Sequence, residues 1–174
     1  MIVSGNSSTF QDRSDELVRS ISKTMTEKQL TVSTAESITG GLIGALLVSV
    51  PGASSYFKGG VTAYSNESKE NVLGVRRRTL TSRGAVSKET AIEMAYGARR
   101  LFETSISVAC TGIAGPSGQT DAKPIGLVYV AIVTDSDSSV IEKRYEGERE
   151  EIRKMTAVDC LKLVLDAAQR MKQA

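Results

Sequence analysis

The spacing of apolar residues along the chain predicts three long amphipathic helices. Over residues 12–29 the apolar positions recur every three or four residues, and Asp12 or Ser14 is the expected N-cap. The same spacing follows a capping serine over residues 87–102 and returns over residues 148–172. The positions expected to face inward are Leu17, Val18, Ile21 and Met25 in the first helix, Ala91, Met94, Ala95, Ala98, Leu101 and Phe102 in the second, and Ile152, Met155, Val158, Leu161, Leu165 and Ala168 in the third.

Five shorter stretches have the pattern of strands. Residues 30–36, 58–65 and 105–110 alternate or are rich in β-branched residues, and each one leads into a polar segment that contains glycine or asparagine. Residues 126–134 and 139–145 are separated by an Asp/Ser-rich turn. This last pair predicts an antiparallel hairpin at the end of the sheet.

The remaining segments complete an alternation of strands and helices. Residues 42–50 are apolar nearly all round, which predicts a central helix, and residues 66–73 predict a short one. Residues 80–87 are expected to form a connector. This order of elements predicts a three-layer α/β/α sandwich around a mixed, mostly parallel sheet with a C-terminal antiparallel hairpin. We expect one domain over residues 12–174, preceded by a flexible polar tail over residues 1–11.

The composition is that of a soluble globular protein and narrows the possible partners. Of 174 residues, 40% are hydrophobic and 24% are charged, and the formal net charge is +2. This charge is too small for a nucleic-acid footprint, and the run Arg76, Arg77, Arg78 is expected to be a solvated turn. No apolar stretch is long enough to span a membrane, and the first residues lack the pattern of a signal peptide. We therefore expect a cytoplasmic protein without a nucleic-acid or membrane partner.

Two residue types limit the chemistry. The chain contains no histidine, which excludes a Ser-His-Asp or Cys-His arrangement and removes the commonest nitrogen ligand of zinc. Cys110 and Cys160 lie in apolar patterns and are expected to be buried free thiols. Any nucleophile must therefore be activated by a lysine, a carboxylate, a tyrosine or backbone dipoles. We expect neither a metal nor a cofactor.

Three polar junctions follow predicted strands. They are ESITGG at residues 36–41, YSNESK at residues 64–69 and TGIAGPSG at residues 111–118. In open α/β sheets, ligands collect beyond the carboxyl ends of the strands, where loops lead into helices. Neighbouring parallel strands would bring the junctions together, although the strand assignments alone leave the order of the strands open. None of the three contains a P-loop or a dinucleotide-binding glycine motif.

Each junction supports two interpretations. Ser37 is either a nucleophile beside helix N–H groups, which favour an oxyanion, or merely the cap of the helix. Glu36 is either a base or a surface or capping carboxylate. Lys69, about one turn into its helix, is either the desolvated base that replaces histidine in a Ser-Lys pair or a solvated lysine. Thr111 lies either in a site or in an ordinary Gly/Pro-rich loop.

Five blocks of the sequence, taken in order, resemble a known family. They are TAESITGG, FKGGVTAYSNESKENVLGV, GAVSKETAIEMA, CTGIAGPSG and KPIGLVYVAI, and they are similar to the signature blocks of the CinA C-terminal family. This family comprises the carboxyl domain of competence/damage-inducible proteins and stand-alone nicotinamide-nucleotide amidohydrolases. The resemblance extends from about residue 17 to residue 168. Two departures are Ile38, where the family often has cysteine, and SGQTDAKP, which replaces a stretch often rich in glycine and acidic residues.

The resemblance implies that nicotinamide mononucleotide is deamidated to nicotinic acid mononucleotide and ammonia. It implies Ser37 as the nucleophile and Lys69 as the general base, and it places Tyr64 and Thr111 near that site. The departure at Ile38 leaves this serine chemistry intact, whereas the altered loop makes the substrate side less certain. The longer family members carry an additional amino-terminal domain, whose metal-dependent activity we do not expect here.

The expected substrate-binding residues lie in the same junctions and in the last helix. N–H groups near Gly40 or Gly112 are expected to hold the oxyanion of the tetrahedral intermediate. Arg149 and Arg153 match a GxRxxIR block of the family and, with Lys123, are candidates for binding the phosphate. The alternative is a surface arrangement of the two arginines with nearby glutamates. The full set is Glu36, Thr39, Gly40, Gly41, Ser65, Asn66, Gly112, Gly115, Lys123, Arg149 and Arg153.

Two other functions stay open at the level of sequence. One is a catalytically silent binding or regulatory module linked to competence or DNA damage, and the other is the same serine chemistry on a different small amide. The joint presence of Ser37, Tyr64, Lys69 and Thr111 favours the enzyme. A small-molecule substrate is then the expected partner, and a homo-oligomer is expected because closed assemblies are common among enzymes of this size.

Overall fold

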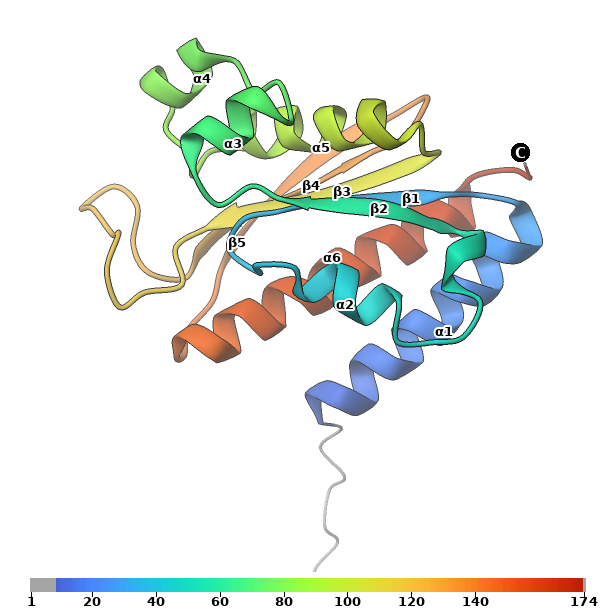
Figure 1. Cartoon of the computed structure of the whole chain (residues 1–174). Coiled ribbons are helices and arrows are strands. Elements are labelled where there is room, and N and C mark those ends of the chain that lie inside the picture. Colours follow the sequence, from blue (N-terminus) through green and yellow to red (C-terminus); the bar gives the residue numbers. More distant parts are fainter. Residues whose placement is uncertain (1–8, 174) are drawn as a thin grey trace, which may run out of the picture.

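A five-stranded mixed sheet lies between two layers of helices (Figure 1). The computed structural model describes residues 9–173. β1 is parallel to both β2 and β3, whereas β3, β4 and β5 are successively antiparallel. The strands are β1 (Val32–Glu36), β2 (Phe57–Thr62), β3 (Ile106–Gly112), β4 (Leu127–Val133) and β5 (Ser138–Arg144), in the spatial order β2-β1-β3-β4-β5.

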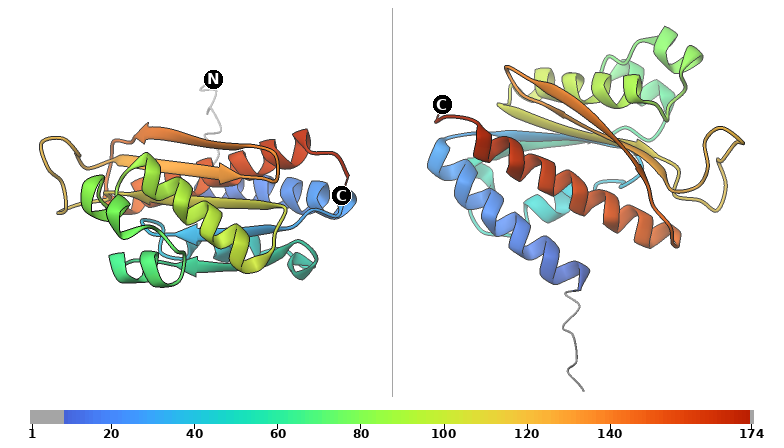
Figure 2. Two further views of the ribbon diagram at one scale, coloured as in Figure 1. Left: turned by 90° about the horizontal axis from the view of Figure 1, so that it is seen from above. Right: turned by 180° about the vertical axis from the view of Figure 1, so that it is seen from behind.

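The helices divide between the two faces of the sheet, so the predicted three-layer sandwich is confirmed. One face carries α1, α2 and α6, with α1 and α6 side by side, and the other carries α3, α4 and α5 (Figures 1 and 2). The helices are α1 (Phe10–Lys28), α2 (Leu42–Leu47), α3 (Asn66–Asn71), α4 (Arg77–Ser82), α5 (Lys88–Phe102) and α6 (Arg149–Arg170), with a 3₁₀ turn η1 (Ala53–Ser55) between α2 and β2.

The two faces of the sheet bury different kinds of side chain. The α1/α2/α6 face buries large aliphatic residues such as Ile21, Leu47 and Ile152. The α5 face is built largely from alanines, and small side chains let α5 approach closely. A Cβ atom placed on Gly97 of α5 would lie 2.0 Å from the carbonyl oxygen of Leu73.

Local sequence signals explain where the long helices begin. Ser87 caps α5 by accepting a hydrogen bond from the N–H of Thr90, as predicted. The predicted cap of α1 is wrong, because Thr9 occupies that position and shares a capping box with Asp12. The helix therefore begins at Phe10, inside the predicted tail over residues 1–11, of which residues 1–8 lie outside the described part of the chain.

The short elements differ most from the prediction. The expected connector at 80–87 begins inside α4, and Arg76 is the N-cap of that helix rather than part of a solvated turn. Arg76 pairs with Glu93, and Arg77 with Glu70, so tertiary ion pairs fix a segment whose apolar pattern is weak. α2 ends at Leu47 rather than at residue 50.

Two predicted burial assignments are also corrected. The face of α2 that contains Ala45 is exposed, so this helix lies at the edge of its layer and not at the centre. Leu101 is 52% exposed, although the stripe of α5 predicted an inward position. The last turn of α5 places the neighbouring Phe102, not Leu101, against Gly59 of β2.

No helix within the described range is both long and apolar enough to cross a bilayer. Cys110 and Cys160 are free, buried thiols, as the sequence predicted.

Candidate functional site

The carboxyl ends of three parallel strands, β2, β1 and β3, lie side by side at one end of the sheet. Ser37 follows β1, Tyr64 follows β2, and Gly112 ends β3. The three predicted junctions therefore converge, as expected for an open sheet of this kind. A cavity of about 260 Å³ opens there, lined by Ser37, Ile38, Tyr64, Lys69, Ala85, Val86, Thr111, Gly112, Ile113, Ala114, Ser117, Gly118 and Arg149.

A serine hydroxyl and a lysine amine touch at the base of this cavity. Lys69 Nζ lies 3.0 Å from Ser37 Oγ and 2.7 Å from the carbonyl oxygen of Ala63, to which it donates a hydrogen bond. Lys69 is only 1% exposed, so the interpretation as a solvated lysine is wrong. Burial lowers the pKa of its ammonium below the ordinary value, and the neighbouring Cys110 partly opposes this effect. The geometry can therefore pass the hydroxyl proton of Ser37 to a neutral amine.

The short helix α3 delivers Lys69 to this position. Its N-cap Ser65 forms a reciprocal capping box with Ser68, and the N–H of Lys69 donates to the carbonyl oxygen of Ser65. The hydroxyl of Ser65 is therefore used by the helix, and Asn66, the next residue, is exposed on the outside. Neither residue lines the cavity, in contrast to the prediction that both bind substrate.

Glu36 holds the beginning of α2 and does not face the cavity. Its Oε2 accepts hydrogen bonds from Thr39 Oγ1 at 2.7 Å and from the N–H groups of Gly41 and Ile43 at 3.0 Å each. Its Oε1 accepts from the N–H of Gly44 at 2.8 Å. Because the residue is 1% exposed, Glu36 is a buried capping carboxylate rather than a substrate ligand.

This arrangement changes which backbone N–H groups are available to an oxyanion. The N–H of Gly40 donates to the carbonyl oxygen of Ser37 at 3.2 Å, so it is not free as predicted. Within residues 9–173 the N–H of Ile38 has no acceptor, and Ile38 lines the cavity. Gly112 also lines it, and a Cβ there would lie 2.7 Å from Val128 and 2.8 Å from the carbonyl oxygen of Leu127.

Thr111 and Tyr64 occupy different parts of the cavity wall. Thr111 is buried, and its hydroxyl donates to the carbonyl oxygen of Ala85 at 2.8 Å. It thereby ties the end of β3 to the loop before α5. Tyr64 is 63% exposed at the mouth, where its hydroxyl accepts a hydrogen bond from Arg149 at 2.9 Å.

Arg149 and Arg153, in the first two turns of α6, contact loops of the site and form no ion pair with a carboxylate of residues 9–173. Arg149 also donates to the carbonyl oxygen of Gly115 at 2.7 Å, and Arg153 donates to that of Thr39 at 2.7 Å. Neither forms an ion pair with any residue in the range 9–173, so the alternative of a surface arrangement with glutamates is wrong. Arg149 lines the cavity, whereas Arg153 lies beside it in an adjoining groove that Arg149 also borders.

Lys123 and several other predicted ligands do not reach the cavity. The amine of Lys123 donates to the carbonyl oxygen of Arg83, which anchors the β3–β4 loop. The predicted substrate ligands that do not line the cavity are Glu36, Thr39, Gly40, Gly41, Ser65, Asn66, Gly115, Lys123 and Arg153. The lining residues that the prediction missed include Ala85, Val86 and Ser117. Only their position inside the GAVS and GIAGPSG blocks could have indicated from the sequence that they line the cavity.

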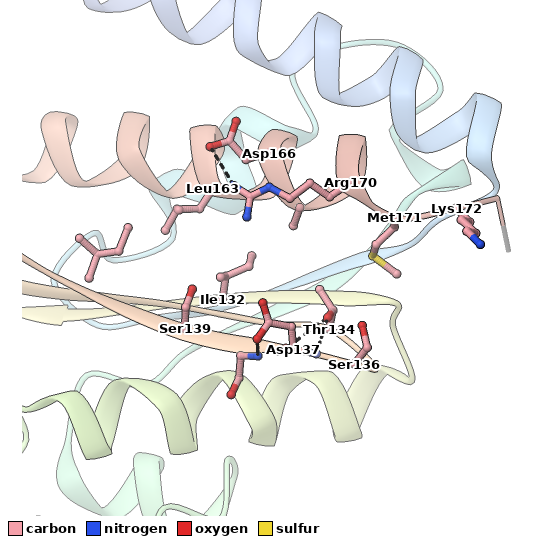
Figure 3. A pocket seen from close by; sticks show the side chains of 13 residues that line it. Ile132, Thr134, Ser136, Asp137, Ser139, Leu163, Asp166, Arg170, Met171 and Lys172 are labelled. Carbon is pink, nitrogen blue, oxygen red and sulfur yellow. Dashed lines mark hydrogen bonds and ion pairs between the residues drawn. The ribbon is translucent and has the colours of Figure 1, made fainter.

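A larger hollow lies near the other end of the sheet. It measures about 620 Å³ and is formed by the β4–β5 turn and the end of α6, with an apolar floor that includes Ile132 and Met171 and a polar rim that includes Ser136 and Arg170 (Figure 3). It contains no serine–lysine contact. Within the described chain, no group of three or more side chains is placed to hold a metal ion.

Comparison with known proteins gives concordant results. The family model described as CinA C-terminal domain matches residues 14–168. A competence-damage inducible protein of Acetivibrio thermocellus is 44% identical over 163 residues, which are 94% of this chain and 40% of that protein. One of Halothermothrix orenii is 50% identical over 137 residues, which are 78% of this chain and 33% of that protein. The chain thus spans well under half the length of these relatives.

Solved structures show the same fold. The competence/damage inducible protein CihA from Agrobacterium tumefaciens superposes with a TM-score of 0.89 at 41% identity, covering 94% of this chain and 99% of that one. A CinA superfamily protein from Klebsiella pneumoniae gives a TM-score of 0.87 at 28% identity, covering 91% and 99%.

Proposed function

The chain belongs to the CinA C-terminal domain family, and we propose that it is an amidohydrolase that converts nicotinamide mononucleotide and water to nicotinic acid mononucleotide and ammonia. The observation that carries this proposal is the 3.0 Å contact between Ser37 Oγ and Lys69 Nζ at the base of a cavity. The chain contains no histidine, and a buried lysine is one of the few side chains able to activate a serine in its place.

The reaction proceeds in two halves that use the same amine. Neutral Lys69 takes the proton from Ser37 Oγ as this oxygen attacks the carboxamide carbon. The Lys69 ammonium then protonates the departing nitrogen, which leaves as ammonia, and an ester on Ser37 remains. Water next attacks the ester carbon while Lys69 takes its proton. The proton returns to Ser37 Oγ as the ester bond breaks, and nicotinic acid mononucleotide is released.

The oxyanion donor that we propose differs from those that the sequence favoured. Because Glu36 and Ser37 engage the N–H groups of Gly41, Ile43, Gly44 and Gly40, the unpaired N–H of Ile38 is the candidate donor. It belongs to the residue that follows the nucleophile, as in other serine hydrolases. Gly112 serves the close packing of β3 beside this residue, because a Cβ there would lie 2.7 Å from Val128 and 3.0 Å from the side chain of Ile38.

Arg149 is the proposed phosphate ligand. It lines the mouth of the reaction cavity and the adjoining groove that contains Arg153, and neither guanidinium has a carboxylate partner within residues 9–173. The cavity of about 260 Å³ is small, which suits a pyridine ring with its carboxamide. The ribose phosphate would extend outward to the guanidinium groups, which bind phosphate well.

The direct test is to incubate the purified chain with nicotinamide mononucleotide and to measure ammonia and nicotinic acid mononucleotide. We expect wild type to form both products in equal amounts. Ser37→Ala and Lys69→Ala should each lower kcat by about 10³-fold or more, because residues that act as a unit are each indispensable. Ser136→Ala, at the far turn, is the matched control and should retain full activity.

Each other outcome would change the proposed function, its mechanism or its substrate. Binding of the nucleotide without ammonia release would identify a catalytically silent module and overturn the proposal. Ammonia release that survives Ser37→Ala, with circular dichroism unchanged, would discard the serine mechanism and keep the reaction class. Release only from other small amides would keep the mechanism and change the substrate.

A further inference from the structure

A single buried carboxylate organises the segment that contains the nucleophile. Glu36 accepts four hydrogen bonds, one from the hydroxyl of Thr39 and three from the N–H groups of Gly41, Ile43 and Gly44. All four donors lie within the eight residues that follow it. A carboxylate with two oxygens can accept this number of bonds, whereas a protonated or amide side chain cannot accept all of them.

The same segment is fastened from other sides as well. The N–H of Ser37 donates to the carbonyl oxygen of Cys110, and the N–H of Gly40 donates to the carbonyl oxygen of Ser37. Arg153 donates to the carbonyl oxygen of Thr39 from α6. Gly40 and Gly41 have positive φ angles of 64° and 97°, which let the chain turn sharply around the carboxylate. Ser37 therefore begins a turn over residues 37–41, and this turn wraps around the carboxylate of Glu36.

We propose that Glu36 is a positioning residue, which holds the turn over residues 37–41 so that Ser37 Oγ stays within reach of Lys69. This proposal rests on the proposed function for its kinetic part. Glu36 does not touch the substrate or transfer a proton, because both its oxygens already accept hydrogen bonds from residues 39–44 and the residue is 1% exposed.

The informative substitution is Glu36→Gln, which keeps the shape and removes two acceptor sites. Whichever way the new amide is oriented, its NH₂ group meets an N–H donor, since Gly44 faces one oxygen and Gly41 and Ile43 face the other. We expect the turn to loosen and kcat to fall about tenfold to a hundredfold, because a displacement of about 1 Å can cost that much. KM should stay unchanged, because the contacts of Arg149 with Tyr64 and Gly115 are intact.

Glu93→Gln is the matched control. Glu93 is a partly buried carboxylate that, like Glu36, accepts from a backbone N–H, that of Arg76, and from a hydroxyl, that of Thr79, and that also pairs with the guanidinium of Arg76. It lies between α4 and α5 and does not line the cavity. The Glu93→Gln variant should be less stable than wild type, and its kcat per folded molecule should be unchanged. If Glu36→Gln also keeps its kcat, or if it changes KM instead, the positioning role is wrong.

A milder variant keeps the test decisive if Glu36→Gln does not fold. Thr39→Val preserves the shape of the side chain and removes the hydroxyl, which donates to Glu36 Oε2 and also contacts Cys110 Sγ at 3.1 Å. We expect the same kinetic signature at about threefold, because the carboxylate loses one of its four hydrogen bonds. An unchanged kcat in this variant would count against the proposal.

Amide hydrogen exchange separates the positioning role from the proposed reaction. In Glu36→Gln, exchange in the peptide that covers residues 37–47 should accelerate at least about tenfold, while the peptides of α5 keep their wild-type rates. This measurement needs no substrate. Wild type without ammonia release but with this local acceleration on substitution would overturn the function and retain the positioning role. Unchanged exchange would overturn the positioning role even in an active enzyme.

Discussion

At the scale of single residues, the candidate chemistry depends on where a lysine is buried. Lys69 belongs to a short polar helix, yet its amine reaches inward to the carbonyl oxygen of Ala63 and to Ser37 Oγ. Charged groups avoid such surroundings, so the fold favours the neutral amine. The burial of Lys69 therefore supports its proposed role as the base in a chain without histidine.

The pH dependence of the reaction follows from this burial. Because burial lowers the pKa of Lys69 from the ordinary 10.5, the fraction of neutral amine, and with it kcat, should rise with pH and level off below the pH at which an exposed lysine titrates. Below the midpoint we expect a rise of about tenfold per pH unit. Initial rates from pH 6 to 9 check this. A flat profile with chemistry rate-limiting contradicts it, and Lys69→Arg should be inactive throughout because a guanidinium stays protonated.

Arg149 makes a separate prediction about the substrate. Arg149→Ala should raise KM for nicotinamide mononucleotide about tenfold to a hundredfold, as expected for a charge-assisted bond of about 1.5–3 kcal/mol. Nicotinamide riboside, which has no phosphate, should be turned over equally well by this variant and by wild type. Arg144→Ala, which removes an exposed guanidinium paired with Glu142, is the control. An equal loss on both substrates would show that Arg149 acts through Tyr64 and the loops instead.

The sequence predicted the contact between Ser37 and Lys69 better than it predicted the residues around them. Ser37 and Lys69 stand in blocks that resemble a family, and parallel strands bring their ends together. The role of Glu36 was not predictable in the same way, because a carboxylate beside a serine looks identical whether it faces solvent or folds back onto the next helix. Only the three-dimensional path of the Gly40–Gly41 turn decides between these.

At the scale of elements, the close packing of α5 depends on one glycine. Gly97 lies against the backbone of Leu73, in the segment between α3 and α4, and Arg100 of the same helix donates to the carbonyl oxygen of Leu73. The segment that follows α3, the helix of Lys69, is therefore held directly against the backbone of α5 at Gly97.

Gly97→Ala should destabilise the fold by about 1–3 kcal/mol, because its Cβ would lie 2.0 Å from a backbone oxygen and the helix must move. Chemical denaturation measures this difference. Gly44→Ala is the matched substitution, since its Cβ would meet only ordinary contacts at 3.5 Å, and helix propensity favours alanine there. Equal stabilities of the two variants would refute the packing argument.

The predictability of the elements follows the strength of their apolar pattern. α1, α5 and α6 have stripes of three or more turns and were located within a few residues. α4 contains the sequence RRTLTS, whose one apolar side chain gives no period, and its place is fixed by Glu93 and Glu70 from other helices. The end of α2 was missed because its apolar run continues past the last helical turn.

At the scale of the whole molecule, the first and last helices are joined at one end. The amine of Lys28, in the last turn of α1, donates to the carbonyl oxygens of Ala168, Gln169 and Met171 at 2.9, 2.7 and 2.6 Å. These are the unpaired carbonyls at the end of α6, where a positive charge is favourable. Residues that are 140 positions apart in sequence thus join α1 to α6 within one helical layer.

Lys28→Met should lower the free energy of unfolding by about 1–2 kcal/mol, since three carbonyls lose a charged donor. kcat should not change, because α1 ends where β1 begins, whereas Ser37 follows the last residue of β1 at the other end of that strand. Lys23→Met, an exposed position of the same helix, serves as the control in the same denaturation experiment. A loss of activity without a loss of stability would contradict this division of the molecule.

The homo-oligomer stays a prediction for the assembled molecule, and so does the single domain over residues 12–174. Sedimentation of the purified chain would decide the first. The relatives that extend well beyond this chain show that the same unit also occurs within longer proteins.

The two cysteines have a practical consequence for studying the protein. Both are completely buried within the α1/α6 face, so the folded chain offers no accessible thiol to an alkylating reagent. A thiol introduced at exposed Ser136, in the turn far from the reaction cavity, would therefore be modified alone by a maleimide dye. A single fluorophore could thus be attached at this turn without occupying the pocket that contains Ser37.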